Sequence, residues 1–214
     1  QPYDPLYPRQ PSLDAMDVPA AWELADLDRA VVVAVLDTGV SDHPQLAGRL
    51  LPGYGFAGRG DGVWGPEWED HVSHGTHVAG TIAAAIDDGA GIAGIVPGAR
   101  ILPVRVLGEG SAAYAIAAGI RWAAGLEVTG VPLNPHPARV INMSLAILET
   151  DVIRDALDSA LETGAVLVAA AGNSGPYPFS VWYPALHPGV VAVSSVDAAG
   201  DSYWGSSRGP EVDV

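Results

Sequence analysis

The chain contains an apolar run at residues 31–36, Val-Val-Val-Ala-Val-Leu, which ends at Asp37 and is followed by Gly39. A run of aliphatic residues bounded by a turn is typical of a strand that is buried on both faces of a parallel sheet. Asp37 is therefore expected at the carboxyl end of such a strand. Open α/β sheets form their sites at this edge, so the run predicts both the fold class and the place of a site.

Strand-like and helix-like segments alternate along the chain, which predicts an α/β fold: a parallel sheet with helices on both faces. The expected strands are residues 31–36, 101–107, 139–143, 165–170 and 190–196, and the expected helices are residues 19–25, 74–85, 112–124 and 151–162. The Gly- and Pro-rich stretches 52–66 and 134–137 predict surface loops. Residues 1–214 show no repeat or boundary and are expected to be one domain, with the proline-rich residues 1–11 as an extended N-terminal arm.

Composition limits the partners of this domain. With 214 residues, of which 49% are hydrophobic, the chain can bury a sizeable core. Its net charge of −15 argues against a nucleic-acid partner, because phosphate binding needs clustered Lys and Arg. The chain has no Cys, which excludes disulfides and thiol chemistry within it. No apolar run approaches the length of a membrane span, so we expect no membrane partner.

Asp37, His74 and Asn173 stand in glycine-rich segments, His74 within residues 73–80 and Asn173 within residues 171–175. His74 opens a helical pattern, where a neighbouring carboxylate would offset the unfavourable effect of the helix dipole on a cation. Asp37 would accept from one ring nitrogen, fix the tautomer and leave the other nitrogen free to take a proton from a hydroxyl. The pair is therefore predicted to be a general base and its orienter. Taken alone, Asp37 and Asn173 would each be interpreted as turn residues.

The histidines His71, His74 and His77 suggest a metal site as an alternative. Steps of three residues place the first and the last about 120° apart around a helix, which does not converge on one ion. The zinc-protease pattern of two His at i and i+4 with an adjacent Glu is absent from this segment. We therefore expect no catalytic metal.

Taken in order, these segments resemble a subtilisin-type serine protease, or subtilase, over nearly the whole chain. The matching segments are Asp37-Thr38-Gly39 with His43-Pro44, and residues 70–80, 104–108, 140–145, 169–175, 206–207 and 209–214. The resemblance implies a three-layer subtilisin-like fold, with Asp37 and His74 as members of a Ser-His-Asp triad. It implies that Asn173 donates its side-chain amide to the oxyanion of the tetrahedral intermediate. It also implies a secreted serine endopeptidase without a catalytic cofactor.

The chain departs from this family at the nucleophile. In subtilases the serine lies in a Gly-Thr-Ser motif on a central helix beyond the segment that residues 209–214 resemble, and residues 1–214 contain no Gly-Thr-Ser. The resemblance places Ser73 beside the base, Ser174 beside the oxyanion donor and Ser144 in a substrate-binding strand. We therefore expect a fold that is incomplete at the C-terminus, with the serine beyond Val214 in a C-terminal remainder that acts as a partner, and no activity from residues 1–214 alone. The alternative is a catalytically inactive peptide-binding or structural module.

Two segments resemble the edges between which subtilases hold an extended peptide by main-chain hydrogen bonds. These segments are Gly110, Ser111 and Ala112, and Ser144, Leu145 and Ala146. By the same resemblance Leu107 and Tyr114 line neighbouring subsites, and Trp182 lies near the base of the primary pocket, unless it packs within a loop. Ala146 and Ile147 stand where the family usually has two glycines, which predicts a narrower pocket. The expected substrate is an extended peptide, and the enzyme is expected to be a monomer.

The loop at residues 87–91 resembles the calcium loop of the family, with Asp87 as the expected ligand. Calcium prefers oxygen ligands of this kind. Gln45 stands where the family often has an aspartate ligand, and a neutral ligand should weaken binding. A structural calcium ion is thus the expected cofactor, and the alternative is that the acidic residues of a Gly-rich turn are solvated.

Overall fold

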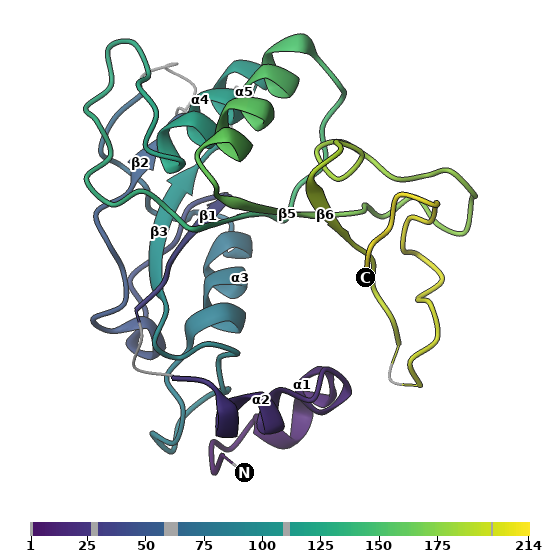
Figure 1. The fold of residues 1–214 in the computed structure, drawn as a ribbon. Helices are drawn as coiled ribbons and strands as arrows, with labels where there is room; N and C mark the ends of the chain where they lie inside the picture. The colour runs from purple at the N-terminus through teal and green to yellow at the C-terminus, as the bar shows by residue number, and fades with distance from the viewer. Residues whose placement is uncertain (1, 27–29, 58–63, 109–111, 198) are drawn as a thin grey trace.

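The computed structural model describes residues 2–26, 30–57, 64–108, 112–197 and 199–214 (Figure 1). Within these ranges a six-stranded parallel sheet has the strand order β2-β3-β1-β4-β5-β6. The strands are β1 (Val32–Asp37), β2 (Tyr54–Gly55), β3 (Arg100–Arg105), β4 (Val140–Met143), β5 (Val166–Ala170) and β6 (Val190–Val193). The helices are α1 (Pro11–Ala15), α2 (Val18–Leu24), α3 (His74–Ala83), α4 (Ala113–Ala123) and α5 (Asp151–Glu162), with 3-10 helices η1 (Tyr7–Arg9) and η2 (Pro44–Leu46).

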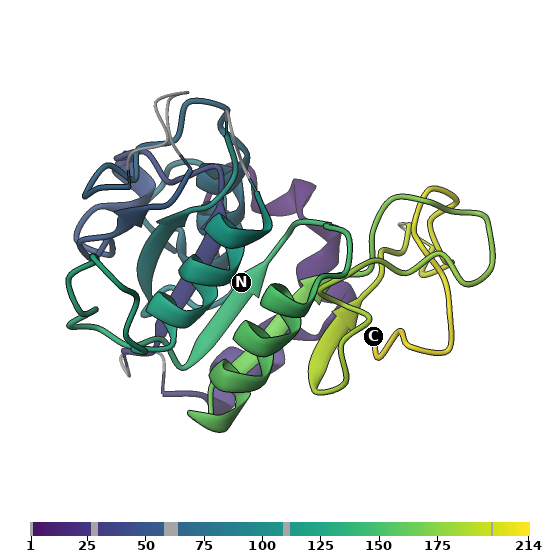
Figure 2. The same cartoon turned by 90° about the horizontal axis from the view of Figure 1, so that it is seen from above.

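Helices cover both faces of this sheet. Helices α4 and α5 pack against each other on one face, and α3 packs on the opposite face against β1 and β3 (Figures 1 and 2). The sequence prediction of a parallel α/β sheet with helices on both faces is therefore confirmed, and every strand and helix expected from the sequence is present with its bounds shifted by a few residues at most.

The central strands β1 and β3 are buried at every position after the first. Side chains alternate between the two faces, so Leu36 joins the larger apolar cluster with α4 and α5, whereas Val33 and Val35 join the smaller cluster that includes Ala79 of α3. Burial on both faces explains why the sequence of β1 is a continuous apolar run. It also places Asp37, the last residue of β1, between two packed layers.

The other half of the sheet is covered on one face alone. Strands β4, β5 and β6 bury alternate residues against the α4 and α5 side, including Ile141, Leu167 and Ala192. The residues between them stay partly exposed, and no helix in the described ranges lies under β5 and β6 (Figure 1). We call this surface the open sheet face; its residues are Asn142, Val168, Ala170, Val191 and Val193. Parallel sheets are normally covered on both faces, so the open sheet face is a place where a further element can pack.

Two expectations from the sequence differ from the structure. Strand β2 lies within the stretch 52–66 that was expected to be loop, because pairing of Tyr54 with Val104 at the sheet edge depends on a distant segment. The expected N-terminal arm is not extended throughout its described residues, 2–11. The η1 turn interrupts them, and Asp4 is buried because its carboxylate accepts hydrogen bonds from the N–H groups of the loop after α3.

The helices of the described residues are all too short or too polar to cross a membrane.

A polypeptide limited to residues 1–214 is expected to bind an apolar fluorescent dye at the open sheet face, because contiguous exposed apolar surface attracts apolar partners. Val168→Thr and Val193→Thr should reduce the dye fluorescence. The control Val35→Thr, at a fully buried position under α3, should increase it by loosening the core. A sharp thermal transition without dye binding would contradict this expectation.

Candidate active site

Asp37 and His74 meet at the carboxyl edge of the sheet. Asp37 ends β1 and His74 is the first residue of α3, and Nδ1 of His74 lies 2.7 Å from Oδ1 of Asp37. The Asp37 side chain is fully buried, whereas 53% of the His74 side chain is exposed. The carboxylate therefore holds one ring nitrogen from the protein interior, and the rest of the ring is accessible to a group that approaches from outside.

Glycine at position 75 allows this close approach. A Cβ atom on Gly75 would overlap the carbonyl oxygen of Gly39 and would lie 2.9 Å from Cβ of Asp37. Gly39 has a φ of 108°, a conformation that favours glycine, and it turns the chain away after β1. The absence of a side chain at Gly75 thus lets α3 begin directly against the end of β1.

Asp70 connects the turn after β1 with the start of α3. Its Oδ1 accepts hydrogen bonds from Thr38 Oγ1 at 2.9 Å and from the N–H groups of Val72 and Ser73, both at 2.8 Å. Its Oδ2 accepts from Thr76, from the backbone nitrogen at 2.9 Å and from Oγ1 at 2.6 Å. Asp70 is not among the site residues expected from the sequence, although an acidic residue shortly before a predicted helix is a known signal for capping.

These hydrogen bonds determine the ionisation of Asp70. Burial by itself raises the pKa of Asp70, but the hydrogen bonds from Thr76, Val72 and Ser73 outweigh burial, so its pKa lies below the ordinary value. A carboxyl group whose pKa is lowered by folding stabilises the fold above its unfolded pKa. That contribution is lost as the pH falls through the lower, folded value. Asp70 is therefore an ionised acceptor at neutral pH.

A cavity of about 470 Å³ lies at the same edge of the sheet, after β4 and β5. Its lining residues are Ser144, Leu145, Ala146, Ala170, Gly172, Asn173, Ser174 and Trp182. The indole nitrogen of Trp182 donates to Ser174 Oγ at 2.8 Å, which fixes the ring in the cavity wall. The structure thus brings together the expected pocket residues on Ser144–Ala146 with Asn173 and Trp182, because parallel strands end at one edge.

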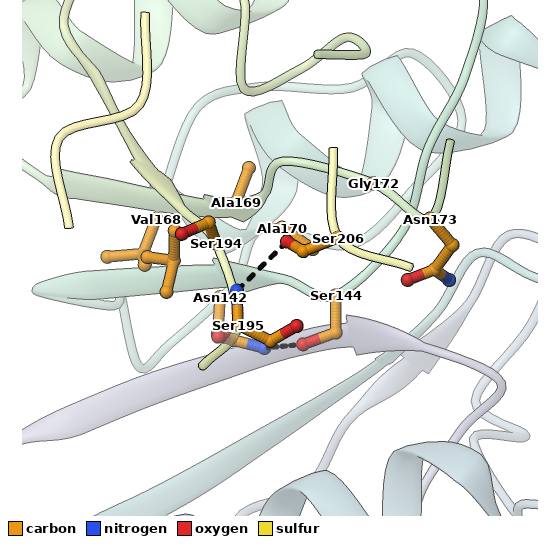
Figure 3. A pocket seen from close by; sticks show the side chains of 11 residues that line it. Asn142, Ser144, Val168, Ala169, Ala170, Gly172, Asn173, Ser194, Ser195 and Ser206 are labelled. Atoms are coloured by element: carbon orange, nitrogen blue, oxygen red, sulfur yellow. Dashed lines mark hydrogen bonds between the residues drawn. The ribbon is translucent and has the colours of Figure 1, made fainter. Parts of the chain in front are cut away.

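A second cavity, of about 300 Å³, opens on the open sheet face and is shown in Figure 3. Its lining includes Asn142, Val168 and Val193 from the sheet, and it shares Ser144, Ala170, Gly172 and Asn173 with the first cavity. Asn173 therefore lies between the candidate substrate pocket and the open sheet face. Within the second cavity Asn142 donates to Ser144 Oγ at 3.0 Å, and the Ser195 N–H donates to Ser206 Oγ at 3.0 Å.

No serine of the described ranges is hydrogen-bonded to Nε2 of His74. Ser174 Oγ accepts from Trp182, and Ser207 Oγ accepts from the Ser174 N–H at 3.0 Å. Ser73 precedes His74 as the N-cap residue of α3, with a φ of 76°. The position of the nucleophile beyond Val214 stays a prediction.

The remaining expected substrate residues lie around α4. Leu107 is partly buried against the larger apolar cluster, and its N–H donates to the backbone oxygen of Asp37 at 3.1 Å. Ala112 is the N-cap residue of α4, and Tyr114 in its first turn is exposed. Gly110 and Ser111 lie outside the described residues.

The expected calcium loop lies against the N-terminal segment. Asp87 accepts from the Tyr3 N–H, whereas Gln45 donates from Nε2 to Asp88 Oδ2 at 2.7 Å and has its buried Oε1 without a hydrogen-bond partner. Asp4 is adjacent, since one of its oxygens accepts from the Asp88 N–H at 3.2 Å. Within the described residues no group of three or more His, Cys, Asp or Glu side chains is arranged so that it could hold a metal ion. Gln45, Asp88 and Asp4 are thus linked by hydrogen bonds and offer oxygen atoms of the kind that calcium prefers, and the expected role of Asp87 stays a prediction.

Comparison with known proteins identifies the family. The sequence profile of the subtilase family matches residues 28–214. The chain is 37% identical over 218 residues to thermitase of Thermoactinomyces vulgaris, with 100% of this chain and 72% of thermitase covered. It is 36% identical over 221 residues to an extracellular basic protease of Dichelobacter nodosus, with 89% of this chain and 36% of that protein covered.

A solved structure shares the fold. It is a protease from Pseudoalteromonas arctica PAMC 21717, which superimposes with a TM-score of 0.90 at 36% sequence identity and covers 100% of this chain and 71% of its own. The chain belongs to the subtilase family. It spans little more than a third of the length of the extracellular proteases it matches from Dichelobacter nodosus, at 36%, and Xanthomonas campestris, at 38%.

Gly75→Ala is expected to destabilise the fold by about 1–3 kcal/mol, because the added methyl group forces α3 away from the end of β1. The matched control is Gly80→Ala on the same helix, where a Cβ meets nothing within 4 Å. This control should stabilise the fold by about 1 kcal/mol through helix propensity. Chemical denaturation of both variants measures the difference, and equal effects would refute the proposed close approach.

Proposed function

We propose that the chain provides the base, the orienting carboxylate and the oxyanion donor of a secreted serine endopeptidase. The observation that carries the proposal is the 2.7 Å contact between exposed His74 and buried Asp37 at the sheet edge that also carries Asn173. This is the arrangement that activates a hydroxyl nucleophile, in which a carboxylate fixes the imidazole tautomer and the free ring nitrogen accepts the proton.

The proposed reaction proceeds through an acyl-enzyme. A serine oxygen attacks the peptide carbonyl carbon while its proton passes to Nε2 of His74, and Asp37 stabilises the imidazolium. The amide of Asn173 donates a hydrogen bond to the negatively charged oxygen of the tetrahedral intermediate. His74 then gives the proton to the leaving amine as the C–N bond breaks. Water repeats the sequence on the ester, which releases the acid and restores the serine.

The serine is proposed to come from a segment outside residues 1–214 that packs on the open sheet face. The apolar residues Val168 and Val193 there are partly exposed, and the cavity on that face reaches Asn173. A segment that covers this face would bury its apolar surface and bring a side chain beside the oxyanion donor. The relatives support this proposal because the chain spans 72% of thermitase and 71% of the protease of known structure.

The proposed substrate is a protein segment bound in an extended conformation. Ser144, Leu145 and Ala146 follow β4 and line the cavity, and a peptide is proposed to pair with this segment by main-chain hydrogen bonds. Ala146 and the ring of Trp182, which is held by its hydrogen bond to Ser174, both line this cavity and are proposed to shape the primary pocket. Secretion is proposed because the relatives from Dichelobacter nodosus and Xanthomonas campestris are named extracellular proteases.

The natural polypeptide that carries residues 1–214 is expected to be labelled by a fluorophosphonate at a serine, and to be insensitive to thiol reagents. Asp37→Asn and His74→Ala should abolish labelling, because the hydroxyl then lacks its base. Asn173→Ala should lower kcat by about a hundredfold or more with little change in KM, which is the effect that loss of this donor has in subtilisin.

Asp197→Asn is the matched control, since its carboxylate caps a loop by accepting hydrogen bonds from the N–H groups of Ala199 and Asp201. Unchanged proteolysis after complete reaction with the fluorophosphonate would refute the serine mechanism. Tight binding of an extended peptide without labelling or hydrolysis would instead support the inactive peptide-binding module.

We further propose that calcium, when bound, is held by Asp4, Gln45 and Asp88 and fastens the N-terminal segment to the loop after α3. Removing calcium with a chelator should then lower the Tm of the natural polypeptide, because a ligand that binds the native state alone stabilises it. Gln45→Ala should abolish the calcium-dependent part of the Tm. Asp87→Asn should retain it, since Asp87 bonds to Tyr3 instead. An identical Tm with calcium and with chelator would refute this site.

A further inference from the structure

We propose that Asp70 is a positioning residue for the Asp37–His74 pair, which it fixes by holding the turn after β1 against the first turn of α3. The inference rests on the proposed function, because this pair is its acid–base centre. Asp70 bonds to neither residue directly; its partners are their neighbours in the chain.

The first link runs through Thr38. Its Oγ1 donates to Asp70 Oδ1 at 2.9 Å and accepts from the Gly75 N–H at 3.0 Å. Thr38 follows Asp37 and Gly75 follows His74, so one hydroxyl connects the residues adjacent to both members of the pair. Because the Thr38 proton is directed to Asp70, an oxygen lone pair remains for Gly75. Asp70 therefore fixes the direction of this bridge.

The second link is the cap of α3. Ser73 occupies the N-cap position in a left-handed conformation, and its side chain makes no capping hydrogen bond. Asp70 performs this role by accepting the N–H groups of Ser73 and Thr76. The first N–H groups of a helix have no partner within the helix, and an anion is favoured there by the helix dipole. Since α3 begins at His74, loss of this cap would loosen the turn that carries the imidazole.

The third link closes the network on the far side of the turn. Thr76 Oγ1 donates to Asp70 Oδ2 and accepts from the Ser41 N–H at 3.0 Å, while Ser41 Oγ donates to the main-chain oxygen of Asp70 at 2.9 Å. The segment after β1 is thus held at both Thr38 and Ser41. Asp70 is 7% exposed, so water competes little for these bonds.

The two possible roles of Asp70, in stability alone or in positioning the pair, lead to different expected results. A residue that only stabilises the fold would lower the free energy of unfolding and leave the His74 ring unchanged in the molecules that stay folded. A positioning residue would change the hydrogen bond between His74 and Asp37 in the folded molecules. The distinguishing observable is therefore the proton on Nδ1 of His74, which a fixed tautomer places toward Asp37.

The test is NMR of the histidine rings in the natural polypeptide labelled with ¹⁵N, below the unfolding temperature of each variant. Asp70→Asn should broaden or abolish the Nδ1 proton signal of His74 and shift its ring nitrogens toward a mixture of tautomers. Thr38→Val, which removes the bridging hydroxyl with little change in shape, should do the same. Thr38→Ser restores the hydroxyl and should restore the signal, and Asp197→Asn should leave it unchanged.

If Asp70→Asn does not fold, the Thr38→Val and Thr38→Ser comparison decides the question. A full Nδ1 proton signal in folded Thr38→Val would overturn the proposal, as would a signal that Thr38→Ser fails to restore. In the hydrolysis assay kcat of Thr38→Val should fall by about tenfold to a hundredfold with KM little changed, the cost of a misplaced catalytic group. The ring signals are independent of hydrolysis, so failure of the proposed protease activity would leave the result on Asp70 interpretable.

Discussion

The hydrogen bond between buried Asp37 and half-exposed His74 is the interaction on which the site depends. Ionised carboxylates are costly to bury unless they are hydrogen-bonded, and Asp37 lies at the end of a strand covered on both faces. Its Oδ1 accepts from the Thr38 N–H and contacts Nδ1 of His74, both at 2.7 Å, while within the described residues its buried Oδ2 has no partner. The imidazole of His74 is thus one of the few groups whose hydrogen bond offsets the free-energy cost of burying the Asp37 carboxylate.

The local geometry around this bond follows from close packing of α3 on the end of β1. Gly75 makes room for the contact, and Asp70 holds the two segments together with hydrogen bonds instead of apolar surface. Glycines permit a close approach but do not enforce it, because they contribute no side-chain contacts. The ionised carboxylate of Asp70, which accepts hydrogen bonds from several N–H and O–H donors, provides the attraction between the two segments that the glycines do not.

The sheet is covered unequally, and the candidate site lies where the cover ends. Under β1 and β3 both faces are packed, whereas β4, β5 and β6 keep one face partly open beside Asn173. The two cavities meet at Asn173, one bounded by Trp182 and the other by the open sheet face. In the proposed function, the substrate and the segment that carries the serine reach the same amide from these two sides. The protein interior on the α4 and α5 side provides the rigid support for both.

The sequence by itself determined the fold class and the central pair of residues. The apolar run before Asp37 requires burial on both faces, and the segments around His74 and Asn173 carry enough local chemistry to indicate the family, which the comparisons confirm. Boundaries of the main strands also followed, because periodicity and turns are local properties of the chain. The same local signals favoured an extended arm over the turn at η1.

Only the tertiary structure decided which distant groups meet. The edge strand β2, the burial of Asp4 and the unpartnered oxygen of Gln45 depend on contacts between segments far apart in the chain. The role of Asp70 is of the same kind, since its link to Thr38 spans 32 residues and closes only when α3 packs on β1. Hydrogen bonds of this type are short-ranged and directional, so no pattern along the sequence specifies them until the fold brings donor and acceptor together.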